Sequence, residues 1–328
     1  MKNLPAAWRR SALGAAVFCC LTQLAAAETV TAPNGSATPL PGQAGQPDQT
    51  DVTNPAAGKP TQKQEINGPL PVTWNDTYIG YRYGNDYHYP GVGAKVVQNV
   101  GYLTTTGGFA FGSYAFNVDY LVSNAANPEA GGPSDGGAQE IYSVGRVELS
   151  GGKILNRPIG FGPFRDFGLT VGYEFGTKND AYAERARMLV VGPTVEFALP
   201  RGFWNLTVGA RTESNHNGIT DVDVHFNTAW HAESSWLYPF RIGPVPVIFR
   251  GFASLTGPKG RDGFGVETTT EFLLRTALLA DVGSLAGHPR VIYAGVGYEY
   301  WHHMYGSPTS ETTGTITSAP MLMAELHF

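Results

Sequence analysis

Charged side chains of both signs recur at alternate positions inside otherwise apolar segments of this chain. In the segment 139–150, Glu140, Arg146 and Glu148 share one face of an extended chain, whereas Ile141 and Val147 lie on the other. Opposed charges that line a confined, wet space stabilise one another and discriminate among ions and polar solutes. These residues are therefore suited to the recognition and passage of solutes, which involve no covalent step.

The same alternation assigns a larger set of charged residues to this wet face. These residues are Arg82, Asp119, Glu140, Arg146, Glu148, Asp166, Glu174, Arg211, Glu213, Asp223, His225, Glu267, Glu271, Arg275 and Glu299. Glutamates outnumber arginines among them, which predicts a weak preference for cations or tolerance of neutral solutes. Tyr78 and Tyr142 are predicted to reach the same space and to stack on a planar solute. A structural network of charges that fills the interior remains an alternative.

Catalytic and metal chemistry find weaker support. An outer-membrane deacylase or phospholipase would need a serine and a histidine within hydrogen-bond reach. His302 and His303 lie near Ser307 and Ser310, but this spacing matches no known motif. His302 and His303 beside Glu299 could offer three metal ligands, but neighbouring residues of a strand point to opposite faces, so the two histidines point apart unless the strand has ended. We therefore predict a protein that is not an enzyme, with no metal and no cofactor.

The elements that must position these residues are strands. From Trp74 onward, twelve segments alternate apolar and polar residues, and Gly, Asn, Asp and Pro separate them. Many run for about 10–14 residues, close to the length of a tilted membrane strand and longer than an ordinary globular strand. Sheet edges cannot face lipid, so the sheet must close. An all-β, transmembrane antiparallel barrel of about 12 strands is predicted over residues 74–328, as about 255 residues allow roughly 21 per strand and connection.

The first residues predict export. Lys2, Arg9 and Arg10 precede a short apolar run that ends in small residues, so we interpret residues 1–27 as a signal peptide. Both cysteines lie within it. Its removal leaves 19 basic and 27 acidic residues, and this net charge of −8 argues against nucleic acid as a partner. Residues 28–73, rich in Pro, Gly, Gln and Thr, are predicted to form a disordered linker.

Turns and loops are expected to alternate around the barrel. Residues 124–137 and 306–315 are predicted to form long outer loops, whereas residues 200–202 and 242–245 are predicted to form short periplasmic turns. Two uninterrupted strands are predicted at 222–234 and 265–280. Aromatic residues near strand ends are predicted to form interfacial girdles. They are Tyr87, Tyr89, Trp236, Tyr238, Tyr300, Trp301 and Tyr305.

A set of sequence strings resembles the Tsx-like outer-membrane channels, the nucleoside-specific channel-forming proteins and related outer envelope proteins. The strings are WNDTYIGYRYG, FNVDYLVS, GGAQEIYSVGRVELS, FGPFRDFGLTVGYEFGTKND, MLVVGPTVEF, KGRDGFG, VGYEYWHH and AELHF. The resemblance runs from about Trp74 to Phe328 and implies a twelve-stranded barrel for passive passage of small polar solutes, nucleosides among them. The opening strand and the long N-terminal extension depart from the family, and no nucleoside-contacting residue can be matched.

These observations predict an integral protein of the bacterial outer membrane that acts as a channel. Its expected partners are outer-membrane lipid and lipopolysaccharide, a small polar solute, and the barrel-assembly machinery, which would read the C-terminal Phe328. Two alternatives stay open. One is the lipid-modifying enzyme considered above, and the other is a structural or surface-receptor barrel without transport.

Overall fold

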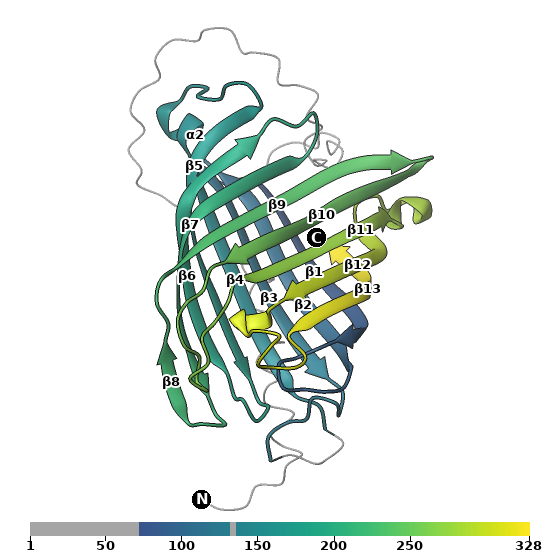
Figure 1. Cartoon of the computed structure of the whole chain (residues 1–328). Helices are drawn as coiled ribbons and strands as arrows, with labels where there is room; N and C mark the ends of the chain where they lie inside the picture. Colours follow the sequence, from purple (N-terminus) through teal and green to yellow (C-terminus); the bar gives the residue numbers. More distant parts are fainter. Residues whose placement is uncertain (1–71, 132–135) are drawn as a thin grey trace, which may run out of the picture. The chain divides into compact units, whose positions relative to one another are not determined.

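A computed structural model describes residues 72–131 and 136–328, so the predicted signal peptide and nearly all of the predicted linker lie outside the described residues. The described chain is almost entirely antiparallel sheet (Figure 1). Its strands are β1 (Val72–Tyr87), β2 (Val96–Phe109), β3 (Gly112–Ser123), β4 (Gln139–Ser150), β5 (Phe164–Lys178), β6 (Arg185–Phe197), β7 (Phe203–Asn217), β8 (Val222–His225), β9 (Ala229–Ile242), β10 (Val245–Thr256), β11 (Glu271–Asp281), β12 (Ile292–His302) and β13 (Ile316–His327).

Twelve of these strands close into a ring. Each pairs with its neighbours in the chain, β1 pairs with β13, and β7 pairs with both β6 and β9. The seam between first and last strands runs from Tyr78 opposite His327 to Gly84 opposite Met321. The prediction of a closed twelve-stranded antiparallel barrel is confirmed, and the barrel begins at Val72, two residues before the predicted start of this region at Trp74.

One predicted strand is divided, and another starts later than predicted. The segment 222–234 forms β8 and the start of β9, because β7 continues beyond its pairing with β9: Arg211 pairs with Ala229, the first residue of β9, and farther along Ser214 pairs with His225 of β8. The segment 265–280 becomes strand only at Glu271, since residues 257–270 form a loop. The prediction of uninterrupted strands was wrong in both places.

The two ends of the barrel differ. Five connections lie at one end of the barrel, the turn end. Three of them are short and comprise residues 110–111, 198–202 and 243–244, and the other two contain the helix α2 (Gly151–Leu155) and the 3-10 helix η2 (Gly283–Ala286). At the loop end lie 88–95, 124–138, 179–184, 218–228, 257–270 and 303–315, the last with η3 (Met304–Gly306). In Figure 1, α2 marks the turn end at the top and β8 the loop end at the bottom. Longer loops face the cell exterior in outer-membrane barrels. Within the described ranges, no helix is long and apolar enough to cross a bilayer.

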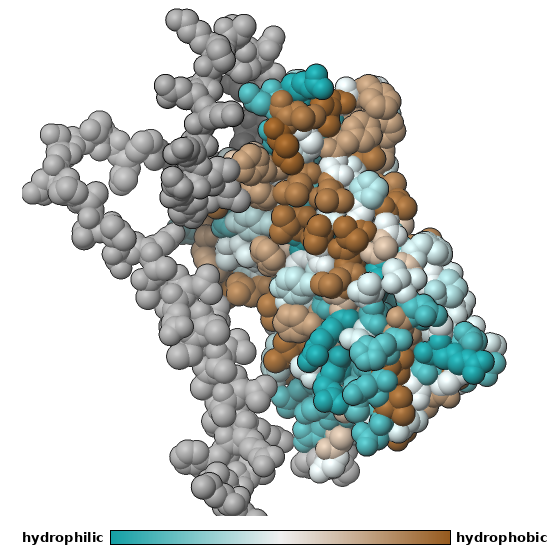
Figure 2. Space-filling model, turned by 90° about the vertical axis from the view of Figure 1, so that its left-hand side faces the viewer, coloured by the Kyte–Doolittle hydropathy of each residue, from teal (hydrophilic) through white to brown (hydrophobic). Residues whose placement is uncertain are grey.

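The barrel wall has an apolar outside and a polar inside. On β5, Leu169, Val171 and Phe175 are exposed on the outer face, whereas Thr170 is buried on the inner face. Figure 2 shows apolar side chains gathered in a band above a hydrophilic region. An exposed apolar band around a closed barrel is stable only in lipid. The chain is an integral barrel of the outer-membrane type.

Aromatic residues at the loop end do not all join a girdle. Tyr87 and Tyr89 are buried with Val96 and Met304 in an apolar cluster inside the barrel mouth. Trp301 and Tyr305 pack against that cluster, so the girdle prediction was wrong for these four aromatics. The loops fold inward there and give the rings a protein environment. Tyr238, by contrast, is exposed on the outer wall near the turn end.

Candidate channel interior

A first group of charges lies within the barrel around Asp119 of β3. Its carboxylate pairs directly with Arg82 of β1, accepts from Asn117 at 2.8 Å and lies 3.6 Å from the Arg275 guanidinium of β11. Arg275 also donates to Glu299 at 2.7 Å. Four strands separate β3 from β11 around the ring, so this Asp119 cluster reaches across the lumen. The sequence predicted all four charged members for the interior.

A second group is centred on Arg146 of β4. Its Nε and Nη2 each lie 2.9 Å from a carboxylate oxygen of Glu233 on β9, and its guanidinium also pairs with Glu174 of the neighbouring β5. Backbone carbonyls of Gly145 and Tyr173 accept from Nη1 at 3.1 and 3.0 Å. Three strands separate β4 from β9. The Arg146–Glu233 pair therefore bridges the lumen from one wall to the other, and this bridge narrows the lumen.

A third group lies beside the β1–β13 seam. Glu325 of β13 accepts from Tyr102 of β2 at 2.5 Å, pairs with Arg250 of β10 and lies 3.3 Å from His327. Tyr78 stacks on His327 with ring centroids 4.4 Å apart. The protein already packs against this buried tyrosine, so the expectation that Tyr78 stacks on a solute was wrong. Tyr142 is half-buried and donates to Glu174 at 2.5 Å.

The loop end of the interior holds further charges. Arg211 lies 3.3 Å from Glu213 and 4.0 Å from Glu271, and Lys259, from the 257–270 loop, donates to Glu213 at 2.5 Å. Lys178 lies 3.8 Å from Glu140. Outside the strands, burial raises the pKa of Glu184, in the 179–184 loop, to about 8. A carboxyl group with this pKa is mostly protonated at pH 7, so Glu184 adds little negative charge to this mouth.

Some predicted interior residues lie elsewhere or near the turn end. Asp223 and His225 are exposed on β8, and Glu267 is exposed in the 257–270 loop, so the structure does not bring these three into the lumen. Alternation along these segments predicts strands of the barrel wall, but the segments form β8 and a loop outside the wall. Glu148 accepts from Asn205 across the interior at 3.1 Å, and Asp166 accepts from the backbone of Gly152 at 2.9 Å, next to α2.

The interior is acidic overall. Of the charged interior groups described above, seven are basic and, apart from Glu184, ten are acidic. Several carboxylate oxygens there have no hydrogen-bond donor within the described protein. They belong to Glu140, Glu148, Glu213 and Glu271. Buried acceptors are nearly always satisfied, so these oxygens suit water, cations or the donor groups of a solute.

His302 and His303, the histidines considered for an enzyme, contact groups other than a serine hydroxyl. His303 Nδ1 lies 2.9 Å from the carbonyl oxygen of Thr270, and the ring of His302 lies 3.8 Å from that of His303. Within 72–131 and 136–328, no hydrogen bond joins a serine hydroxyl to either ring. Neither His302 nor His303 therefore forms a serine–histidine pair in the described part of the chain.

Comparison with solved structures finds similarity to outer-membrane barrels. No family model matches the chain, and no curated protein matches it. It is similar to an outer-membrane channel from Pseudomonas putida F1, with 11% identity over 82% of this chain and 100% of that chain and a TM-score of 0.43. It is also similar to the NanC porin, with 7% identity, coverage of 76% and 98%, and a TM-score of 0.39. The translocator domain of the autotransporter NalP from Neisseria meningitidis has 9% identity, coverage of 80% and 90%, and a TM-score of 0.39.

Proposed function

We propose that this barrel is a passive channel for small polar solutes, with a preference for cations. The observation that carries the proposal is the acidic excess inside a closed wall: the interior groups described above hold ten acidic side chains, apart from Glu184, against seven basic ones. Rings of carboxylates favour cations in membrane pores. The Arg146–Glu233 bridge and the Asp119 cluster divide the lumen into narrow, charged passages suited to small solutes.

Planar-bilayer recording tests this function. Purified protein in a salt gradient should give discrete conductance steps. The sign of the reversal potential should be the one that indicates a preference for cations. Replacing Glu140 and Glu271 together by Gln should move that potential toward zero, because each carboxylate lies inside the barrel and has an oxygen that accepts no hydrogen bond from the described protein. The same change at exposed Glu267 and Glu311 is the matched control. Absence of conductance above lipid leak would leave a structural or receptor barrel as the function.

Nucleosides are the solute class that we propose within this function. Support comes from the resemblance of the barrel sequence to the Tsx-like channels and from Tyr142, a half-buried ring beside the Arg146 cluster. A planar base can stack on an aromatic ring, and its ribose hydroxyls can donate to carboxylates. Added nucleosides should reduce the current in a concentration-dependent way, more strongly than sugars of similar size. Equal block by both would reject nucleoside preference while leaving the channel intact.

A further inference from the structure

The apolar band on the outer wall of β6 ends abruptly toward the loop end. Val191 and Leu189 face outward with 47% and 63% of their surface exposed, and the next two outward positions are Arg187 and Arg185. Alternate residues of a strand lie about 7 Å apart. The two guanidinium groups therefore follow directly on the lipid-facing band, at the level where lipid headgroups begin, on the side with the longer loops.

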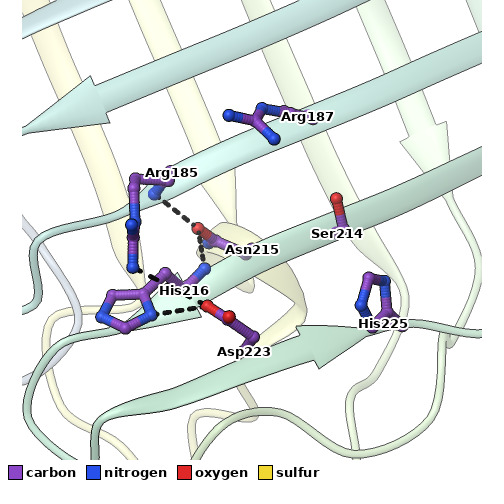
Figure 3. A pocket seen from close by; sticks show the side chains of 7 residues that line it. All are labelled: Arg185, Arg187, Ser214, Asn215, His216, Asp223 and His225. Carbon is purple, nitrogen blue, oxygen red and sulfur yellow. Dashed lines mark hydrogen bonds and ion pairs between the residues drawn. The ribbon is translucent and has the colours of Figure 1, made fainter.

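A pocket of about 160 Å³ opens beside these arginines (Figure 3). The β7–β8 hairpin forms its other wall and contributes Ser214, His216 and His225. The volume is several times the roughly 30 Å³ that one water molecule occupies in the liquid. The pocket thus has room for a small ionic group and presents several hydrogen-bond donors to it.

Hydrogen bonds hold the lining in place. Asn215 Oδ1 accepts from the backbone N–H groups of Arg185 and His216 at 2.9 and 2.8 Å, which ties β6 to β7. Asp223 Oδ1 lies 2.7 Å from His216 Nδ1 and 3.8 Å from Arg185. This carboxylate occupies one edge of the pocket and fixes the positions of Arg185 and His216.

The pocket carries a net positive charge. Two arginines face one carboxylate among its lining residues, and Asp221, 3.9 Å from the other ring nitrogen of His216, does not line it. Within the part of the chain that the structure describes, Arg187 makes no ion pair. An unpaired, exposed guanidinium above an apolar surface is suited to bidentate binding of phosphate.

We propose that this pocket binds a phosphate group of a lipid A headgroup in the outer leaflet. Arg187 would bind two phosphate oxygens, while Arg185, Ser214 and the histidines offer further donors. The acyl chains of the same molecule would lie along the exposed Leu189 and Val191 below. Free phosphate shares the headgroup chemistry but lacks that apolar contact, so the position next to the band favours the lipid.

Native mass spectrometry of the detergent-solubilised full chain tests the assignment. Diphosphoryl lipid A should remain bound to the wild type, and Arg185→Ala with Arg187→Ala should weaken its binding about tenfold or more. Arg187→Ala alone, which disturbs no ion pair in the described chain, should weaken binding severalfold. The matched control is Arg261→Ala, an exposed arginine of the same end. Heat-dependent gel mobility checks that each variant is folded.

Three results would overturn the proposal. One is equal lipid A binding by the double variant and the Arg261→Ala control. Another is equal binding of fully dephosphorylated lipid A by the wild type, which would show adhesion through the acyl chains alone. The third is displacement of lipid A by an equal concentration of inorganic phosphate, which would make the pocket a site for free anions. None of these depends on whether the lumen conducts.

Discussion

The Arg146–Glu233 bridge gives the sharpest test of how the interior works, because either partner can be removed. Three strands separate β4 from β9, so the pair spans the lumen and should obstruct passage. Glu233→Ala and Arg146→Ala both break the bridge, so both should raise single-channel conductance. Their effects on ion preference should be opposite: loss of Glu233 moves it toward anions, and loss of Arg146 moves it toward cations.

The contacts of the bridge also predict unequal costs in stability. Without Glu233, Arg146 keeps Glu174 and two backbone carbonyls, so the loss should be about 1.5–3 kcal/mol, that of a charged hydrogen bond. Without Arg146, two largely buried carboxylates lose their shared cation, and the loss should be about 3–5 kcal/mol. Urea unfolding in detergent, followed by tryptophan fluorescence, measures the difference.

The assay is planar-bilayer recording with each variant in the same salt gradient. The exposed Arg261–Glu267 pair, at 2.8 Å, supplies matched controls, since Arg261→Ala and Glu267→Ala change the same charges outside the wall. Unchanged conductance in both bridge variants would show that the pair does not obstruct the path. Reversal potentials that shift in the same direction in both would refute the reasoning on charge.

Three further predictions concern the loops and the wall. Burial raises the pKa of Glu184 to about 8, so its stabilising contribution is complete below its ordinary value of about 4.5 and is lost as pH rises through about 8. Glu184→Gln should therefore gain thermal stability relative to the wild type from about pH 5 to about pH 9, and parallel melting curves would contradict this. Glu325→Ala removes a fully buried carboxylate that pairs with an arginine and accepts from a tyrosine, and should cost about 3–5 kcal/mol in urea unfolding. Exposed Glu311→Ala, its control, should change the free energy of unfolding by under about 0.5 kcal/mol, and similar losses in both would refute the role of burial. A Cβ added at Gly112 would lie 1.7 Å from a backbone carbonyl oxygen of β4, so Gly112→Ala should cost about 1–3 kcal/mol in the same titration. Gly101→Ala meets no heavy atom within 4 Å, and equal values for the two alanines would contradict the clash.

Most of the fold was predictable because alternation with period two encodes both faces of a wall. Arg82, Glu174 and Arg211 could be assigned to the interior from their own strands, since a charge facing lipid is costly. The same parity on β13 places Glu325 and His327 inside. The break between β8 and β9 could not be predicted, because it depends on where the pairing of β7 with β9 ends, and a single strand does not encode its register with a neighbour.

The sequence alone could not predict which charged residues pair with one another. Arg146 meets Glu233, 87 positions away, because strand tilt and ring closure bring β4 opposite β9, and neither quantity follows from alternation. Lys259 reaches Glu213 from a loop, where no period exists to assign a side chain to a face. Tyr78 was expected to meet a solute, but its ring packs on His327 of the strand that closes the seam.

An interior built only to hold the wall together would be expected to neutralise its own charge. Arg82 with Asp119 and Lys259 with Glu213 show such pairing, and each pair offsets part of the cost of removing its ions from water. Other carboxylates share one cation, since Glu174 and Glu233 share Arg146, and Glu213 and Glu271 share Arg211. Among the described residues, Glu148 makes no ion pair and accepts only from an amide. Uncompensated carboxylates in a dry lumen would cost several kcal/mol each, or would bind protons. A lumen that admits water and cations avoids this cost, which is the physical reason to expect a cation-preferring passage rather than a closed structural core.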